Sequence, residues 1–405
     1  MWFALVGIGL AILLVGGLYA RWRVAGALTE LGVRERRVRW VRWVLAWLLF
    51  GYPLLVIGAI GFSLLTDRAT LLGFEGPMST WLLVYPFYVT LLAMLQALPY
   101  LLLLEVVHAV LRRRRSVAVA RRVRAIAVLA VVLGFALYTP IRVVAERDAL
   151  RVRHHQVERG TAGPRGAASP PFRIAFVADI QQDAHTDAAR AADVVARINA
   201  TRPDLVLSGG DWINTGPDYI AAAAKTAGAL RSRLGTYSVR GDHEHFGYLD
   251  RERSVGEIER ALAAEGVAML SNQLRWFEHA GKRIGVLFLD YNYLHRTDDP
   301  TIAALIAGLA GADYSILVTH QFDAHVAALV KDRVDLVLGA HTHGGQVNPV
   351  LGVVHVPLAR LETVYIDGRY QLGTTTVIVT AGVGYSLVPF RYASPAAVEI
   401  LELRL

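Results

Sequence analysis

Residues 336–346 read LVLGAHTHGGQ, an apolar run that ends in two histidines one residue apart. Four earlier stretches share this design, because each places candidate metal ligands directly after a short apolar run. They are VADIQ at 177–181, GGD at 209–211, RGDHE at 240–244 and THQ at 319–321. A side chain that directly follows a parallel strand lies at the carboxyl edge of the sheet, where ligand sites of open α/β sheets form. The five stretches therefore predict one shared site.

Between these stretches, strand-like and helix-like patterns alternate, which indicates an α/β domain. We predict strands at 173–178, 205–208 and 236–240 and helices at 188–200 and 220–230. Upstream, GTAGPRGAASPP at 160–171 has the composition of a flexible tether. We therefore expect a linker over 147–171 and a catalytic domain over 172–405.

The first 146 residues predict a membrane domain. Four apolar runs, at about 3–20, 44–65, 80–104 and 125–144, are long enough for helices that cross a bilayer core of about 30 Å. A signal peptide carries its basic residues before the apolar run, whereas here they follow the first run. We therefore expect four transmembrane helices and a multi-pass protein of the cell membrane.

Arginines indicate the orientation of these helices. They gather in the predicted loops after the first and third helices: Arg21, Arg23, Arg34, Arg36, Arg37, Arg39 and Arg42, then Arg112, Arg113, Arg114, Arg115, Arg121, Arg122 and Arg124. The predicted loop between the second and third helices holds Arg68 with Asp67 and Glu75. Because basic loops stay in the cytoplasm, we expect both termini and the catalytic domain outside. Binding of anionic membrane lipids is a second role open to the arginine clusters.

Composition excludes several classes of function. The first 155 residues carry 19 basic and 7 acidic side chains, so the remainder is net acidic although the whole chain has a charge of +8. The basic character thus belongs to the membrane half, and we expect no nucleic-acid partner. The absence of cysteine excludes disulfides, thiolate zinc sites and cysteine nucleophiles. No pattern in the sequence indicates an oligomeric state.

The residue types at the five stretches suit a particular chemistry. Phosphoester hydrolysis at neutral pH needs a nucleophile made from water and compensation for charge on the phosphoryl oxygens. Two metal ions about 3.5–4 Å apart supply both. Imidazole and carboxylate ligands without thiolate suit Mn, Fe or Zn. We therefore expect two divalent metal ions as cofactors.

In this order, the five stretches resemble the calcineurin-like metallophosphoesterases. That family's motifs run Asp-x-His, Gly-Asp, Gly-Asn-His-Asp/Glu, a lone His and Gly-His-x-His. The resemblance covers about residues 172–405, and GVGYSLVPFR at 382–391 with SPAAVEI at 394–400 resembles the branch with a GHTHGGQ motif, many of whose members are membrane-tethered. It implies a four-layer α/β/β/α sandwich, here after a multi-pass helical membrane domain, with the site between the two sheets.

Carried over residue by residue, the resemblance implies a set of metal ligands. They are Asp211 as the bridge, Asp179, Gln181 and His343 for one ion, and Asp242, His320 and His341 for the other. His243 would act on the scissile phosphate as general acid or electrostatic stabiliser, with Glu244 orienting its ring. Gly344, Gly345 and Arg391 are expected to bind substrate. Plain turn geometry for the glycines and a surface position for Arg391 are the alternatives.

Departures from the family pattern refine these expectations. Gln181 stands where the family usually has His, and an oxygen ligand favours Mn over Fe or Zn. His185 is the alternative ligand at this place. Asp242 replaces the usual Asn, and its added charge favours cation binding and disfavours highly anionic monoesters. Ala340 replaces a Gly of the last motif, a change of one carbon.

The resulting expectation is a phosphoester hydrolase. We expect cleavage of a phosphodiester or pyrophosphate bond by a hydroxide that two metal ions activate. Because the membrane domain would hold the site near the outer membrane face, a lipid headgroup or lipid-linked substrate fits. The alternative is a catalytically degenerate receptor or scaffold that keeps a metal site without turnover.

Overall fold

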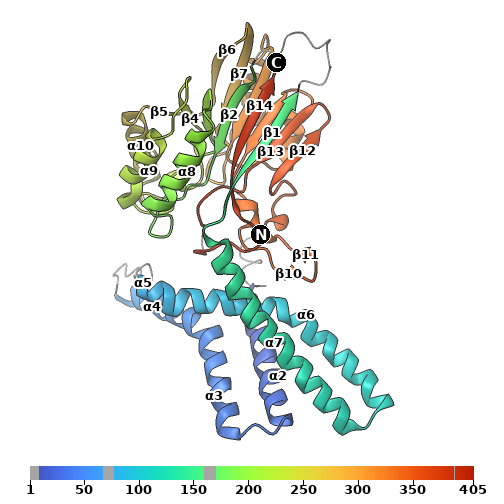
Figure 1. Cartoon of the computed structure of the whole chain (residues 1–405). Helices are drawn as coiled ribbons and strands as arrows, with labels where there is room; N and C mark the ends of the chain where they lie inside the picture. The colour runs from blue at the N-terminus through green and yellow to red at the C-terminus, as the bar shows by residue number, and fades with distance from the viewer. Residues whose placement is uncertain (1–8, 67–76, 159–169, 387) are drawn as a thin grey trace. The chain divides into compact units, whose positions relative to one another are not determined.

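The computed structural model describes residues 9–66, 77–158, 170–386 and 388–405 (Figure 1). The chain divides into two compact units. One consists of Met1–Ala145 with Pro349–His355, and the other of Glu146–Asn348 with Val356–Leu405.

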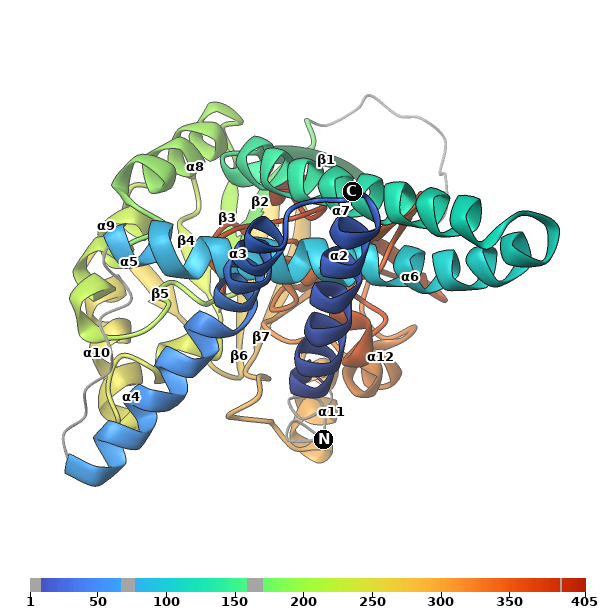
Figure 2. The ribbon, with the colours of Figure 1, turned by 90° about the horizontal axis from the view of Figure 1, so that it is seen from below.

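The first unit is helical (Figures 1 and 2). Its elements are η1 Ile12–Gly16, α2 Gly17–Glu30, α3 Glu35–Ala46, η2 Trp47–Gly51, α4 Tyr52–Thr66, α5 Pro77–Ser79, η3 Thr80–Val84, α6 Tyr85–Arg114 and α7 Val117–Arg147. Four continuous helical segments are long and apolar enough to span a membrane: Gly9–Glu30, Glu35–Ala59, Thr80–Arg114 and Val117–Arg147. The prediction of four such helices is confirmed. Residues 3–8 of the first predicted helix lie outside the described residues.

The helix boundaries differ from the prediction. Helix α2 continues to Glu30, so Arg21 and Arg23 lie within it rather than in a loop. Helices α6 and α7 likewise include all the arginines of the second cluster except Arg115. The apolar runs end before the helices do, because arginine is a good helix former. Arg68, Asp67 and Glu75 lie outside the described residues.

Ion pairs join three of these helices near their charged ends. Glu105 of α6 accepts from Arg23 Nε of α2 at 2.7 Å and from Arg124 Nη1 of α7 at 3.3 Å. Arg124 also reaches Glu30 of α2 at 2.7 Å. The two carboxylates and two guanidiniums balance in charge, as polar groups in membrane helices require.

A hairpin from much later in the sequence completes the helical unit. It consists of β10 Val350–Leu351 and β11 Val354–His355, which pair in antiparallel fashion. Gln96 of α6 is fully buried, and its Oε1 accepts a hydrogen bond from the backbone of Val350 at 3.0 Å. Its Nε2 donates to Thr139 Oγ1 of α7 at 3.2 Å. The hairpin thus satisfies a polar side chain inside an apolar helix, where an unpaired amide would be costly.

The second unit contains two six-stranded sheets (Figure 1). The first has the order β1 Leu150–Glu158, β14 Ala396–Arg404, β2 Phe172–Val177, β3 Leu205–Ser208, β4 Thr236–Ser238 and β5 Val267–Met269. The second has the order β12 Gly368–Leu372, β13 Thr375–Val379, β9 Leu336–Gly339, β8 Tyr314–Thr319, β7 Lys282–Leu289 and β6 Gln273–His279. Strands β2 to β5 are parallel to one another, and so are β7, β8, β9 and β13.

Helices cover the outer faces of these sheets. They are α8 Ala188–Ala200, α9 Ile220–Gly228, α10 Arg251–Ala264, α11 Asp299–Ala307 and α12 Ala324–Val330, with short 3-10 helices η4 Pro217–Tyr219, η5 His243–His245, η6 His343–Gly345 and η7 Leu358–Leu361. Three clusters of buried apolar side chains fill the spaces between the layers. One lies between the two sheets and includes Phe176 and Phe288. The other two pack the first sheet against α8, α9 and α10 and the second sheet against α11 and α12. The predicted four-layer α/β/β/α sandwich is therefore confirmed.

The linker prediction over 147–171 is wrong for Leu150–Glu158. These residues form β1, which pairs in parallel with β14 from Leu150 opposite Ala396 to Glu158 opposite Arg404. Glu399 of β14, fully buried, lies 2.7 Å from His155 Nε2 and 3.1 Å from Arg153 Nη2. Two polar side chains of this segment, Arg153 and His155, are therefore partners of a buried carboxylate. Residues 160–169 of the predicted tether lie outside the described residues.

Candidate metal centre

The predicted ligands follow five parallel strands, three of one sheet and two of the other. Asp179 follows β2, Asp211 follows β3 and Asp242 follows β4, while His320 and His341 follow β8 and β9. Backbone hydrogen bonds join neighbouring loops: Asp179 N donates to Gly210 O at 2.9 Å, and Ala340 N donates to His320 O at 2.9 Å. The strand ends therefore meet at a common edge, as the sequence predicts.

One group of ligand atoms comes from both sheets. Asp242, His320 and His341 each offer an atom within 4.8 Å of the others. Asp242 Oδ2 lies 3.2 Å from His320 Nε2 and 2.9 Å from His341 Nδ1. A divalent ion can be held by such a carboxylate and two imidazoles.

A second group shares His320 with the first. Asp179, Asp211 and His320 also offer atoms within 4.8 Å of one another. Asp211 Oδ2 lies 3.5 Å from His320 Nε2 and accepts from Gln181 Nε2 at 2.9 Å. The two groups therefore adjoin and together bring five ligand side chains to one place, with the carboxylate of Asp211 beside an imidazole that can bind one ion only.

Hydrogen bonds assign the ligand atom of each imidazole. His320 Nδ1 faces the carbonyl of Gly209 at 2.7 Å. A carbonyl can only accept, so Nδ1 carries a proton and Nε2 is the free ligand atom. His341 Nε2 faces Glu362 Oε1 at 3.1 Å, which directs Nδ1 toward Asp242. Such outer partners fix ring orientation in metal sites.

Two buried oxygens support the fit to a metal. Asp179 Oδ1 and Gln181 Oε1 are buried and make no hydrogen bond to any residue within the described ranges. A buried acceptor without a donor is costly, and a cation would satisfy both atoms. The donor set of carboxylate, amide and imidazole therefore fits divalent ions.

The ligand backbones are strained. Five predicted ligands adopt left-handed conformations: Asp179 (φ 53°), Gln181 (φ 51°), Asp211 (φ 58°), His341 (φ 75°) and His343 (φ 50°). Such angles cost on the order of 1–3 kcal/mol each in non-glycine residues and gather at functional sites. Two neighbouring glycines leave the space that these ligands occupy, since a Cβ at Gly241 would collide with Asp211 Oδ1 and one at Gly382 would collide with Asp179 Oδ2.

The ligands strongly perturb one another's protonation. Burial raises the pKa of Asp179 to about 7, and Asp211 contributes to the rise. Burial also acts to raise the pKa of Asp242, but hydrogen bonds from His320 and His341 outweigh it and hold that pKa below its ordinary value. Burial acts to lower the pKa of His341, yet its bonds to Asp242 and Glu362 raise it to about 9. Without metal, the imidazoles thus serve as counter-ions to the carboxylates.

His243 lies beside these groups and is partly open to solvent. Its Nδ1 donates to the carbonyl of Asn214, and its Nε2 lies 4.0 Å from Asp211 Oδ2. Phe246 packs edge-on against the ring at 5.3 Å. Because Nδ1 is committed to a carbonyl, any proton that His243 gives to a substrate must come from Nε2.

The predicted role of Glu244 is wrong. Its fully buried carboxylate accepts from the backbone nitrogens of Asp211, Trp212 and Gly241 at 2.7–2.9 Å. It therefore fixes the loops that carry the ligands, whereas Asn214 orients His243. The error arose because adjacency in sequence does not determine which side chains face each other in a 3-10 turn.

The structure contradicts both the substrate-binding role predicted for Arg391 and its alternative, a surface position. Its guanidinium is fully buried and donates to the carbonyls of Gly384, His343 and Ser394 at 2.8–3.3 Å. Its Nη2 also lies 3.4 Å from His343 Nδ1. Arg391 therefore positions the backbone around His343. Burial and then the charge of Arg391 lower the pKa of His343, which keeps that imidazole neutral.

The remaining candidates have mixed outcomes. His343 belongs to neither group of mutually close atoms among the described residues. Gly344 and Gly345 adopt φ of 63° and 82°, and a Cβ on either would collide with Ser394 or Asn348, so turn geometry explains both. His185 lies in a turn that Asp183 caps, outside both groups.

Three residues around the centre were missed from the sequence. Glu362 bonds His341, Asn214 bonds His243, and Tyr293 donates its backbone N–H to Asp242 Oδ1 at 2.7 Å. The Tyr293 ring also packs edge-on against His341 at 4.7 Å. None of them follows a strand within a motif, so only tertiary contacts reveal them.

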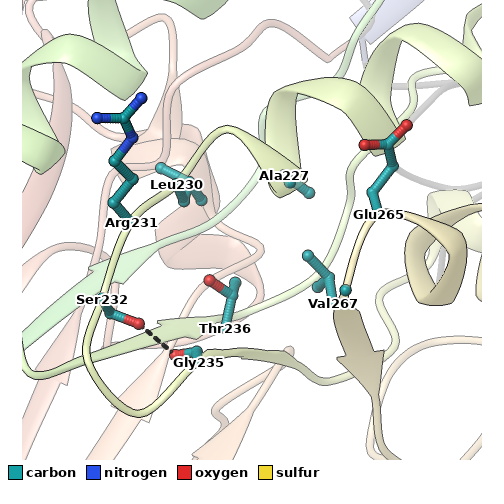
Figure 3. A pocket seen from close by; sticks show the side chains of 10 residues that line it. Ala227, Leu230, Arg231, Ser232, Gly235, Thr236, Glu265 and Val267 are labelled. Carbon is teal, nitrogen blue, oxygen red and sulfur yellow. Dashed lines mark hydrogen bonds between the residues drawn. The ribbon is translucent and has the colours of Figure 1, made fainter.

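A separate pocket of about 280 Å³ lies among α9, β4 and β5 (Figure 3). It is lined by Ala227, Gly228, Leu230, Arg231, Ser232, Gly235, Thr236, Glu265, Gly266 and Val267. These residues lie at or before the first residues of β4 and β5, away from the carboxyl ends that the predicted ligands follow. No predicted ligand lines the pocket. It therefore takes no part in the metal centre.

Comparison with known proteins identifies this domain. Residues 172–345 match the family described as calcineurin-like phosphoesterase. The chain contains a calcineurin-like metallophosphoesterase domain. The predicted resemblance is thereby confirmed, and with it a hydrolase domain for phosphoester bonds. Members of this family use divalent metal ions, and the two ligand groups are candidate sites for them.

Relatives of this metallophosphoesterase domain include membrane proteins. The chain is 28% identical over 215 residues to "Uncharacterized metallophosphoesterase YkuE" of Bacillus subtilis, covering 52% of this chain and 71% of the relative. It is 29% identical over 245 residues to the bovine "Transmembrane protein with metallophosphoesterase domain", covering 58% and 53%. It is 25% identical over 236 residues to "Phosphodiesterase YaeI" of Escherichia coli, covering 58% and 82%. The chain thus spans about half the length of the bovine relative.

Proposed function

We propose that this protein hydrolyses a phosphodiester or pyrophosphate bond at a membrane surface. The observation that carries the proposal is the pair of adjoining ligand groups, which together gather five ligand side chains. A single ion needs one such group, whereas in-line displacement at phosphorus uses two ions to stabilise the attacking and leaving oxygens. The relative called a phosphodiesterase agrees with this bond class.

The residues would divide between two ions. Asp242, His320 and His341 would hold one, and Asp179, Asp211 and Gln181 would contribute to the other. When bound, the ions would supply a nucleophile from water and neutralise charge on the phosphoryl oxygens. We propose Mn, because the amide oxygen of Gln181 adds a hard ligand.

The chain's own side chains have two further tasks. His243, held through Nδ1, would place the proton of Nε2 at the leaving oxygen. The carboxylate of Asp242, where an amide is usual in the family, adds negative charge beside the phosphate. This charge opposes dianionic monoesters and favours diesters, which carry one charge fewer.

We place the reaction at the outer face of the cell membrane. Arginines cluster where the first helix is followed by the second and where the third is followed by the fourth. Both connections therefore favour the cytoplasmic side, and the second unit would lie outside. A substrate with its phosphate at the membrane, such as a lipid headgroup or a lipid-linked pyrophosphate, would be concentrated near such a site.

The decisive experiment is Asp211→Asn in the full-length protein. Activity with Mn against bis-p-nitrophenyl phosphate should fall more than about a thousandfold, equivalent to about 4 kcal/mol of transition-state stabilisation. Asp218→Asn, at an exposed position in η4, is the matched control and should retain activity. Wild-type turnover by Asp211→Asn would exclude the mechanism.

The same preparation distinguishes the enzyme from a degenerate receptor or scaffold. Metal content should be measured together with turnover on a panel of lipid and nucleotide phosphoesters. Bound metal in the wild-type protein without turnover on any of them would favour the scaffold.

A further inference from the structure

A short segment of the second unit exposes several apolar side chains to solvent. Residues 356–364, here called the apolar loop, include Val356, Leu358, Leu361 and Val364, which are 37%, 55%, 63% and 69% exposed. Scattered surface apolar residues are ordinary, but a contiguous set marks a contact surface. The exposed side chains of this loop therefore indicate a surface that contacts another apolar group.

Local geometry gathers two of these side chains on one face. Leu358 and Leu361 are the first and last residues of η7, a 3-10 helix. Side chains three residues apart eclipse each other in a 3-10 helix, so both leucines point the same way. Arg360, between them in sequence, is also exposed. Leucine and arginine are residue types that segments lying in a membrane interface combine.

The apolar loop is fixed to the metal centre at its other face. Glu362 lies 3.1 Å from His341 Nε2 and accepts from Gln321 Nε2 at 2.9 Å. Thr363 is buried, and its hydroxyl donates to the carbonyl of Phe322 at 3.3 Å. The loop thus exposes two leucines, while its Glu362 bonds to the predicted metal ligand His341.

The apolar loop continues directly from the helical unit. The preceding Pro349–His355 belongs to that unit, and Val350 N donates to the buried Gln96 of α6. Within this hairpin, Val353 and Val354 are 97% and 59% exposed. The chain therefore enters the loop from a segment that packs with membrane-spanning helices, which favours bilayer lipid as the partner over a soluble protein.

We propose that the apolar loop lies in the headgroup region of the bilayer and binds the acyl part of a lipid phosphoester whose phosphate enters the metal centre. The assignment of a lipid substrate rests on the proposed function. The contact between loop and bilayer does not, and it can be tested without turnover.

The contact is tested by spin labels, since the chain has no cysteine and a single one gives a unique attachment site. Full-length Leu361→Cys and Leu249→Cys are labelled in phospholipid vesicles; Leu249 is a fully exposed leucine outside the loop. The label at 361 should collide more often with oxygen than with a water-soluble nickel chelate, and the label at 249 should show the reverse. Equal nickel accessibility at both positions would overturn the proposal. Dipolar broadening between labels at 361 would show that a second copy covers the loop, which also overturns it.

The substrate assignment is tested by kinetics of Leu358→Ser/Leu361→Ser. KM for a long-chain phosphodiester in vesicles should rise about tenfold or more, because each buried leucine contributes at least that factor. Turnover of soluble bis-p-nitrophenyl phosphate should change less than about twofold. Leu249→Ser is the control and should behave as wild type. Equal losses on both substrates would exclude a lipid-binding role, whereas a wild-type protein inactive on every phosphoester would refute the proposed function and leave the spin-label result intact.

Discussion

The contribution of His243 should depend on the leaving group. Its Nδ1 is held by Asn214, so Nε2 faces the centre and is the nitrogen that would pass a proton to the leaving oxygen. We expect His243→Gln to lower kcat by about 10²–10⁴ for an alkyl diester, in the range of general-acid catalysis. The loss should be much smaller for a p-nitrophenyl ester, whose leaving oxygen needs little protonation. Equal losses on both esters would contradict the assignment.

Metal binding should release protons. Without metal, the pKa of His341 is raised to about 9 by its bonds to Asp242 and Glu362, against the opposing effect of burial, so the ring holds a proton at pH 7. A cation needs the neutral ring, and therefore apparent Mn affinity should increase as pH rises from about 7 to 9. Calorimetric titration in buffers of different ionisation enthalpy would measure the protons released. An affinity that is flat over this range would contradict the raised pKa.

Arg391 should matter for stability rather than for substrate binding. Its guanidinium serves three buried carbonyls, and an ammonium cannot reach all of them. We expect Arg391→Lys to lower the free energy of unfolding by about 1–3 kcal/mol, the cost of a buried unpaired acceptor. KM should change little in the protein that remains folded. A raised KM with unchanged thermal stability would restore the substrate-binding role.

At the scale of the element, β1 should be held in place by one carboxylate. Glu399 of β14 is buried against Arg153 and His155, so Glu399→Ala would leave His155 without its carboxylate and Arg153 with Asp367 as its remaining partner. We expect a loss of about 1–3 kcal/mol in the free energy of unfolding, the cost of leaving a buried polar group without its partner. Glu402→Ala, three residues along the same strand, removes a partly exposed pair with Arg173 and should cost less than about 1 kcal/mol. Similar losses in both variants, measured by thermal unfolding, would contradict this account.

The elements nearest the site were the most predictable. Strand β3 and helix α8 have the predicted bounds, and Asp179, Asp211, Asp242, His320 and His341 follow their strands as expected. This succeeds because the signal is local: an apolar run sets the strand, and the next residue inherits its position at the sheet edge.

Other features depend on contacts between distant residues and could not be predicted. Strand β1 forms through pairing with residues about 245 positions later. The same holds for Glu362, which reaches His341 from a loop without a motif, and for Glu244, whose partners are backbone nitrogens of another loop. Burial of Arg391 likewise has no local signature.

At the scale of the whole molecule, the arginine distribution predicts topology. We expect the carboxyl terminus at Leu405 to lie outside the cytoplasm. Alkaline phosphatase fused there should therefore be active and a green fluorescent protein fusion dark. A fusion at the α2–α3 turn, close to Gly32, should give the opposite pattern and serves as the internal control. A fluorescent carboxyl-terminal fusion would reverse the orientation.

The hairpin Pro349–His355 has a practical consequence for anyone who wishes to produce the catalytic half alone. A truncation that starts at residue 172 removes β1, an edge strand of the first sheet, and exposes the flank of β14. One that starts at residue 147 keeps β1 but separates Val350 from Gln96. The freed segment would then expose apolar side chains to water and promote aggregation. It lies only a few residues after two predicted ligands in the sequence. A water-soluble version would therefore need this hairpin redesigned as well as the anchor removed.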